Sequence, residues 1–405
     1  MDTLTLKKMT DKKIVRHIPL KPDMNPCINK CKIHFTDCFD SAPARLTLFK
    51  FYVNLLFIMV NQKSGGQKKG SGLSTKAFIL EELRQRQGSP VSGASLAKKT
   101  GVSRVAVWKG VQALTEAGYS IRTLEKGYAL ETGEDDFLYP WEFGGRENFF
   151  RHFSGTGSTM DRAREFAEQG LPEGTVICAE KQSAGRGRNG RTWASRQGGL
   201  FFSVLERPNL ALADYVLPAM IIQIAVAKTL GRICGKKTLL RWPNDIYVDQ
   251  RKIAGVMTEL SGEGDRINWL SGGIGVNVNN PVPSGRITSC AEITGHKVSR
   301  RETLTAILGE IEGLKKKYAA GRVYESRGLA AEWNSLAEGI GGRAAVIDPC
   351  HGDYRFSGEM PEGNERILTR GTYTGIDDSG RCVIRTETER ETLAFSPGLA
   401  SIIFL

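Results

Sequence analysis

One segment rich in glycine and arginine constrains the fold more than any other part of this chain. Residues 185–191 read GRGRNGR, which places three glycines and three arginines within seven positions. Glycine lets a backbone approach a ligand closely and adopt positive φ, and arginine presents a rigid fork of donors to phosphate or carboxylate. The apolar run at residues 200–205 follows at once, so we predict a loop anchored on a buried strand. Its expected ligand is a small anionic molecule. An RGG-type nucleic-acid segment is the alternative, but such segments repeat at length and lack a neighbouring strand.

The distribution of charge separates the N-terminal end from the rest of the chain. The 405 residues are enough for about two to four domains, and they carry a net charge of +12. Residues 1–70 contribute +8 and residues 71–133 contribute +4, which leaves the remaining residues neutral. A function that needs a basic surface is therefore expected at the N-terminal end.

The eight cysteines are scattered, as expected for reduced thiols in a cytoplasmic protein. Cys27, Cys31, His34 and Cys38 stand close together in the basic N-terminal extension, but their spacing is not a common zinc spacing. We therefore predict no metal site there.

The apolar run at residues 46–60 is not expected to span a membrane. It contains Lys50 and Asn54, and it is shorter than the roughly 20 residues that a bilayer requires. As a signal-peptide core it would begin too far from the terminus, and no small-residue cleavage site follows it. We expect instead that translation starts near Met59, which would make residues 1–58 an upstream artefact.

Residues 71–133 are predicted to form a winged helix-turn-helix domain. Residues 75–87 and 92–100 show helical spacing, and a tight turn leads into a further helix over residues 104–117. A short strand at residues 127–130 is expected to form the wing.

The two faces of the third predicted helix have different expected roles. We expect Val105, Val107, Val111 and Leu114 to face the core of this domain. The basic balance favours DNA binding through the N-terminal half of the helix, whereas a small helical interaction domain without DNA is the alternative. The residues predicted to contact DNA are Ser103, Arg104, Ala106, Trp108 and Lys109.

Beyond an acidic linker at residues 131–139, the pattern predicts two further domains. Residues 141–340 alternate strands with long amphipathic helices and should form a mixed α/β domain. Residues 343–405 show short strands between glycine turns, which suits a small SH3-like β-barrel. The expected fold class is therefore α+β.

Four motifs in one order identify a family that this chain resembles. GRGRNGR at 185–191, RWPND at 241–245, RKIAGV at 251–256 and GIGVNVN at 273–279 resemble those of the biotin–protein ligases. With the winged helix, the chain looks most like the bifunctional kind that is also the biotin operon repressor. The resemblance covers about residues 75–405 and leaves residues 1–70 unmatched.

The resemblance implies a biotin–[acetyl-CoA-carboxylase] ligase with a catalytic domain of the biotin/lipoate ligase type. Such an enzyme uses ATP and Mg²⁺ to activate biotin as biotinyl-5′-AMP, and then transfers it to a lysine of a biotin carboxyl carrier protein. Operator DNA, a ligand-dependent homodimer and a cytoplasmic location without membrane attachment are implied as well. The residues suit this chemistry, because a carboxylate and a triphosphate repel each other unless fixed cations and N–H donors surround them.

The resemblance also implies roles for individual residues. Lys252, Arg186 and Arg188 would be catalytic, although Lys252 could also be an ordinary hairpin lysine lying over the sheet. Met160 stands where the family often has asparagine, and Arg241 replaces a usual lysine. The implied biotin contacts are Ser158, Thr159, Met160, Gln182, Arg186, Gly187, Arg188, Lys252 and Gly255. The implied ATP contacts are Gly185, Arg191, Trp193, Asn244, Asp245 and Asn277.

Three other functions remain open at this point. The chain could be a ligand-sensing repressor without turnover, a lipoate or octanoyl transferase of similar fold, or a ligase whose N-terminal domain is a regulatory lid. The presence of Lys252 and of the arginine loop argues against the first, and the GRGRNGR sequence differs from the glycine-rich signature expected of the second.

Overall fold

A computed structural model describes residues 73–131, 136–283, 285–319, 324–348, 367–386, 391–398 and 400–405. All described residues belong to one compact unit, Lys69–Leu405. The predictions for the cysteine cluster at 27–38, for the apolar run at 46–60 and for a start near Met59 lie outside the described residues.

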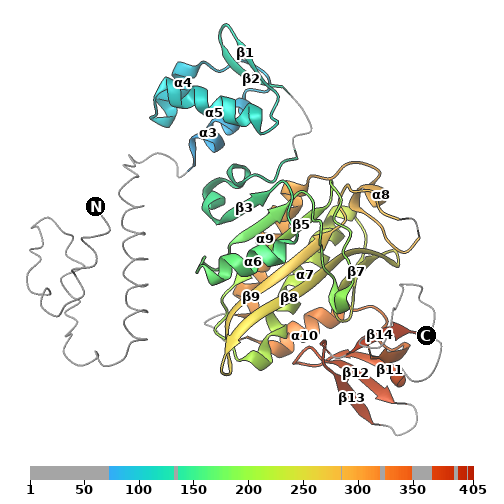
Figure 1. Ribbon diagram of the computed structural model, residues 1–405. Helices are drawn as coiled ribbons and strands as arrows, with labels where there is room; N and C mark the ends of the chain where they lie inside the picture. The colour runs from blue at the N-terminus through green and yellow to red at the C-terminus, as the bar shows by residue number, and fades with distance from the viewer. Residues whose placement is uncertain are drawn as a thin grey trace, which may run out of the picture. The chain divides into compact units, whose positions relative to one another are not determined.

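The predicted helix-turn-helix and wing are both present (Figure 1). Ser74, Ser92 and Ser103 each accept a hydrogen bond from the backbone N–H three residues later, which stabilises the first turn of each helix. The elements are the helices α3 (Thr75–Gln85), α4 (Gly93–Thr100) and α5 (Arg104–Glu116) and the antiparallel strands β1 (Ile121–Leu124) and β2 (Gly127–Leu130).

The prediction that Val105 faces the core is wrong. The buried side of α5 consists of Val107, Gly110, Val111 and Leu114, and Val105 lies on the opposite side with 62% of its surface exposed. Gly110 holds the fourth place on the buried side because α3 approaches closely there: a Cβ atom on it would lie 2.8 Å from Ile79 Cδ1. A search for apolar side chains at helical spacing passes over a glycine and selects the nearby valine instead.

The central domain is built on a seven-stranded sheet with the order β3-β4-β5-β9-β8-β7-β6. Only β3 and β4 are parallel neighbours, so the sheet is mixed, as predicted. Its strands are β3 (Phe150–Phe153), β4 (Val176–Ala179), β5 (Leu200–Glu206), β6 (Thr238–Arg241), β7 (Asp245–Val248), β8 (Arg251–Glu263) and β9 (Arg266–Val276).

Helices of different lengths cover the two faces of this sheet. Two adjacent glycines of β9 mark the faces: a Cβ atom on Gly272 would meet Ile222 of α7, whereas one on Gly273 would meet Met160 of α6. Since neighbouring strand residues point to opposite faces, α7 and α6 lie on opposite sides. The helices are α6 (Thr159–Glu168), α7 (Val216–Cys234), α8 (Cys290–Thr294), α9 (Arg300–Tyr318) and α10 (Ser326–Ser335), with the 3-10 segments η2 (Pro140–Phe149), η3 (Arg188–Gly190) and η4 (Leu212–Asp214).

Among the described residues, Leu212–Cys234 is the single helical stretch long and apolar enough to cross a membrane. In the fold, 78% of it is buried within the protein, where α7 packs against the sheet and α9 (Figure 1). Its all-round apolar composition is that of a core helix.

A five-stranded antiparallel sheet, with the order β13-β12-β11-β10-β14, forms the C-terminal domain. Trp242 and Asn334 are among the residues that attach it to the central domain. Trp242 Nε1 donates to the carbonyl of Gly380 at 3.1 Å, and the amide of Asn334 makes two hydrogen bonds with the backbone of Ile376. The strands are β10 (Arg343–Ile347), β11 (Ile367–Ile376), β12 (Cys382–Thr386), β13 (Thr392–Phe395) and β14 (Ser401–Phe404).

Glu142, in η2, links elements that are far apart in the sequence. Its carboxylate accepts hydrogen bonds from Arg84 of α3, from Tyr119 and from Arg301 of α9. Burial alone would raise the pKa of Glu142, but the hydrogen bonds from Arg84 and Tyr119 outweigh burial and lower it. The buried carboxylate is thus held ionised by its partners.

Replacing Glu332 by glutamine should destabilise the packing of α10 on α7 and α9 in a pH-dependent way. Burial opposes the charged form, but hydrogen bonds from Lys228, Lys317 and Tyr318 outweigh it and lower the pKa of Glu332 to about 2. A carboxyl group with a lowered folded pKa stabilises the fold above its unfolded pKa and loses this contribution as the pH falls through the folded value. We expect Glu332→Gln to lower Tm by about 3 °C at pH 7, and the difference to shrink as the pH falls from 5 towards 2.

Thermal unfolding of both proteins across this pH range measures the effect. Glu165→Gln is the matched control, because Glu165 pairs with Arg162 on an exposed helix surface, where ion pairs contribute little. A Tm difference for Glu332→Gln that stays constant down to pH 2 would contradict the role given to its charge.

Candidate active site

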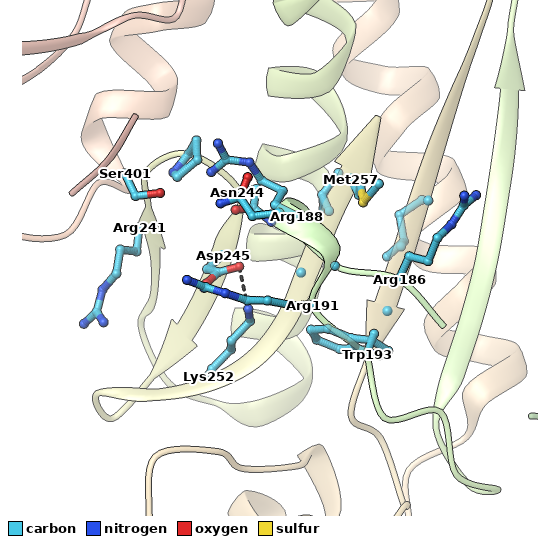
Figure 2. A pocket seen from close by; sticks show the side chains of 18 of the residues that line it. Arg186, Arg188, Arg191, Trp193, Arg241, Asn244, Asp245, Lys252, Met257 and Ser401 are labelled. Atoms are coloured by element: carbon cyan, nitrogen blue, oxygen red, sulfur yellow. Dashed lines mark ion pairs between the residues drawn. The ribbon is translucent and has the colours of Figure 1, made fainter. Parts of the chain in front are cut away.

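A cavity of about 540 Å³ opens between the central sheet, the 185–193 loop and the last strand of the chain (Figure 2). Nearly all residues that the motifs single out line it: Ser158, Thr159, Met160, Gln182, Arg186, Gly187, Arg188, Arg191, Trp193, Asn244, Asp245, Lys252 and Gly255. Gly185 and Asn277 do not line it, and the side chain of Asn277 instead accepts a hydrogen bond from Asn280 at 3.0 Å.

The arginine-rich segment folds back on itself as a tight loop. The backbone N–H of Gly187 donates to the carbonyl of Arg191 at 2.7 Å, and that of Trp193 donates to Gly185 at 2.9 Å. Asn189 and Gly190 take the positive φ values of 57° and 71° at the tip, which is where glycine and asparagine are tolerated best. These bonds turn Trp193 towards the sheet.

Glycines in β8 and β9 form a flat floor for that indole ring. A Cβ atom on Gly255 would lie 3.0 Å from the ring of Trp193, and one on Gly275 would lie 2.5 Å from it. A Cβ atom on Gly273 would lie 2.6 Å from Met160 Sδ in the same way. The glycines therefore let Trp193 and Met160 lie directly on the backbone of the sheet.

Lys252 and Asp245 form an ion pair inside the cavity. Lys252 Nζ lies 2.6 Å from Asp245 Oδ1, and the two side chains are 15% and 14% exposed (Figure 2). The pairing of β7 with β8 brings them together, and Lys252 Nζ also lies 5.2 Å from the centroid of the Trp193 ring. The pair holds the Lys252 ammonium group in the cavity, where an incoming anion can replace the Asp245 carboxylate as its partner.

A second group of polar side chains surrounds the start of α6. Gln182 Oε1 accepts the backbone N–H of Thr159 at 2.7 Å, and Gln182 Nε2 donates to Ser195 Oγ at 2.8 Å. Ser203 Oγ donates to Thr159 Oγ1 at 3.0 Å. Every member of the group is oriented by another one, so this end of the cavity presents fixed donors and acceptors.

The two arginines predicted to be catalytic lie in different surroundings. Arg186 pairs with Asp161 at 2.6 Å and reaches Glu259 at 3.5 Å on the exposed side of the loop. Arg188 is directed to the C-terminal segment, where it donates to the carbonyl of Pro397 and, at 3.3 Å, to that of Ala400. Burial lowers the pKa of Arg188, although a guanidinium still keeps its charge near neutral pH.

Several residues of the cavity were missing from the predicted site. Arg241 lies in a recognised motif, and it makes two hydrogen bonds with Glu338, at 2.6 and 2.8 Å, while its guanidinium carbon lies 3.8 Å from the centroid of the Tyr247 ring. Residues 401–404 of β14 carry no motif, so only the fold brings them to the cavity. Residues 273–275 of the GIGVNVN motif, which the resemblance implies as backbone contacts of the ligand, line the cavity as well. The additional lining residues are Asn189, Thr192, Arg241, Trp242, Pro243, Tyr247, Gln250, Val256, Met257, Arg286, Ile347, Ser401, Ile402, Ile403 and Phe404.

Comparison with known proteins shows which families the chain resembles. The model of the biotin/lipoate A/B protein ligase family matches residues 154–279, and a helix-turn-helix domain model matches residues 75–129. The bifunctional ligase/repressor BirA of Bacillus spizizenii is 32% identical over 335 residues, which cover 78% of this chain and 95% of that protein. BirA of Escherichia coli is 30% identical over 60% of this chain and 77% of its own length. The solved biotin protein ligase from Aquifex aeolicus in complex with biotin and ATP is similar with a TM-score of 0.50 and 29% identity, covering 63% of this chain and 99% of that one.

Proposed function

Because the chain belongs to the family of bifunctional biotin ligases and repressors, we propose that its cavity activates biotin with ATP and that its winged helix binds operator DNA. The enzyme is a biotin–[acetyl-CoA-carboxylase] ligase that uses biotin and ATP. The observation that carries the proposal is the convergence of Lys252, the 185–193 loop and the Gln182 group on one cavity inside the matched region.

In the first step, a carboxylate oxygen of biotin attacks the α-phosphorus of ATP and pyrophosphate leaves. The product is biotinyl-5′-AMP, a mixed anhydride. Two anions must approach each other, so fixed positive charge is the main requirement. We assign this role to Lys252 and to Arg186 and Arg188, with the backbone N–H groups of the loop beside them. The Gln182 group, with Ser158 and Thr159, would hold the polar part of biotin.

The carboxylate and amide oxygens at residues 244 and 245 fit the preference of Mg²⁺ for hard oxygen ligands. Asp245 and Asn244 both line the cavity, next to Lys252. Magnesium bound there with the phosphates of ATP would neutralise part of the triphosphate charge. No cluster of three or more His, Cys, Asp or Glu side chains occurs among the described residues, so the phosphates would supply much of the coordination.

In the second step, the ε-amine of a lysine on a carrier protein attacks the acyl carbon of biotinyl-5′-AMP. The amide forms, AMP leaves with the bonding electrons, and the amine loses its proton. Until then the anhydride must be kept from water. We assign this shielding to the 185–193 loop, with Trp193 and Arg191 on the nucleotide side.

Substituting Gly275 by alanine should impair ATP binding by displacing Trp193. The added methyl group would lie 2.5 Å from the indole ring, so the ring must leave the floor of the sheet. If Trp193 stacks on the adenine, we expect KM for ATP to rise about tenfold, equivalent to the loss of one aromatic stacking contact. Gly313→Ala is the control, because a Cβ atom on Gly313 meets nothing within 4 Å. An unchanged KM for ATP in Gly275→Ala would contradict this placement of Trp193.

For the DNA-binding function we assign Ser103, Arg104, Ala106, Trp108 and Lys109 to the contact with operator DNA. All of them except the half-buried Ala106 are exposed on or next to α5. A homodimer that assembles when the adenylate is bound would present two such helices to a two-fold operator. The remaining finer assignments are a cytoplasmic location, domain limits at 71–133, 141–340 and 343–405, and closure of the C-terminal sheet into an SH3-like barrel.

The decisive experiment is incubation of the full chain with biotin, Mg-ATP and a biotin carboxyl carrier domain. We expect release of pyrophosphate and a biotin adduct on the carrier by mass spectrometry, and no adduct on a carrier whose target lysine is replaced by arginine. Competition between biotin and lipoate in the same assay distinguishes a lipoate transferase. Absence of both pyrophosphate and adduct would leave a repressor without turnover.

A further inference from the structure

An apolar side chain stands in the middle of the exposed surface of α5. Val105 has the largest exposed fraction, 62%, of the exposed large hydrophobic side chains in the described part of the chain. A β-branched residue is also a poor choice for an exposed helix position, because its stiff side chain lowers helix propensity. Val105 thus contributes neither to the core nor to the helix.

The position of Val105 on α5 is well defined. It is the second residue of the helix, after the capping Ser103 and Arg104. Lys109 and Gln112 follow at i+4 and i+7, so they share one face with Val105, and both are exposed. Trp108, 48% exposed, borders this face. We call Val105, Trp108, Lys109 and Gln112 the reading face.

The charges around the reading face favour DNA as its partner. Arg104 and Lys109 belong to α5, Lys98 is exposed on α4, and the only acidic residue of α5 is Glu116 in its last turn. Such a surface complements a phosphate backbone, and it would repel the same surface on a second copy of the chain.

We propose that Val105 recognises thymine through its 5-methyl group, so that each operator half-site holds an A·T pair opposite this residue. The inference rests on the proposed repressor function. Residues in the first turn of a recognition helix reach the base edges in the major groove. Valine can neither donate nor accept a hydrogen bond, and the thymine methyl is the apolar group that the base edges present there. Lys109 and Gln112 then supply hydrogen bonds to the neighbouring bases.

The test uses the full chain with biotin and Mg-ATP. Duplexes bound by the protein are first selected from a random library, and each thymine of the best one is then replaced singly by deoxyuridine, which lacks only the methyl group. We expect one thymine per half-site at which deoxyuridine weakens binding about fivefold, the effect of one buried methyl group. Val105→Ala should bind the thymine duplex and the deoxyuridine duplex with almost equal affinity at that position.

Leu212→Ala is the matched control, because Leu212 is another exposed apolar residue but lies outside the winged helix. It should keep the full discrimination. Since Val105 is largely exposed, Val105→Ala should also keep the Tm and the ligase rate of the parent protein.

The outcomes separate this inference from the proposed function. If the parent protein enriches no duplex, the DNA-binding part of the proposed function and this inference are both overturned. If it enriches a duplex but no thymine is sensitive to deoxyuridine, or if the sensitivity persists in Val105→Ala, only the inference about Val105 is overturned. A Val105→Ala protein that no longer dimerises with adenylate would place this side chain between two copies and overturn it as well.

Discussion

Replacing Lys252 by alanine is expected to slow the formation of biotinyl-adenylate by about 10²- to 10³-fold, while transfer from supplied adenylate slows by less than about tenfold. The difference follows from the charges in the two steps. Adenylation brings a carboxylate against a triphosphate, and we propose that Lys252 is the fixed cation between them. In the transfer step the attacking amine is neutral and the acyl group is already activated, so less depends on a fixed cation.

The ion pair with Asp245 requires a second variant. Removing Lys252 leaves the carboxylate of Asp245, which is 14% exposed, without the cation that lies 2.6 Å away. Part of the loss could then arise from repulsion between Asp245 and the phosphates. In Lys252→Ala with Asp245→Asn this repulsion is absent. Because Asp245 is also proposed to hold magnesium, the reference is Asp245→Asn alone, and we expect adenylation in the double variant to remain at least about 10²-fold slower than in that single variant.

Single-turnover assays measure the two steps separately. Release of pyrophosphate reports adenylation, and addition of purified biotinyl-adenylate with carrier reports transfer. Arg232→Ala is a suitable control, because Arg232 pairs with Glu310 with a side chain that is 58% exposed, and it does not line the cavity. Equal slowing of both steps by Lys252→Ala would show that Lys252 supports the cavity as a whole and has no special role in adenylation.

The parts of the site that could be predicted from sequence lie in compact motifs. Lys252 and Asp245 are seven positions apart and come together because β7 and β8 form one hairpin. The 185–191 loop has the same advantage, since its shape is set by its own glycines and local hydrogen bonds. Residues that contact each other and are also close in the sequence can be identified without a structure.

Other parts of the site depend on packing between distant elements. Phe404 and Ser401 line the cavity although they are about 150 residues from Lys252 and carry no motif. Which arginine of the loop turns to the C-terminal segment depends on where Pro397 and Ala400 lie. Val105 illustrates the same limit within a single helix, because the close approach of α3 to Gly110 determines which side is buried.

Replacing Arg188 by alanine is expected to speed the loss of biotinyl-adenylate by about 10²-fold and, through this, to weaken operator binding. The guanidinium of Arg188 ties the loop to the C-terminal segment through the carbonyls of Pro397 and Ala400. A buried, charge-assisted contact of this kind contributes about 1.5–3 kcal/mol, which corresponds to about 10- to 150-fold in an equilibrium constant. Without it the loop opens more often, and the anhydride leaves or meets water.

Operator binding should report the loss of biotinyl-adenylate through the winged helix at the N-terminal end of the described residues. A ligand shifts an equilibrium only by its different affinities for the two states, so under the proposed coupling a protein that loses its adenylate should fall back to the DNA affinity of the unliganded state. Dissociation of labelled adenylate and gel shifts in biotin plus Mg-ATP measure the two effects. Arg188→Lys should restore little, because lysine lacks the fork that reaches both carbonyls, whereas Arg232→Ala, at an exposed position outside the cavity, should behave as the parent protein. If Arg188→Ala loses adenylate rapidly but binds operator as tightly as before in biotin plus ATP, closure of the loop and DNA binding are not coupled, and the adenylate must signal through another part of the cavity.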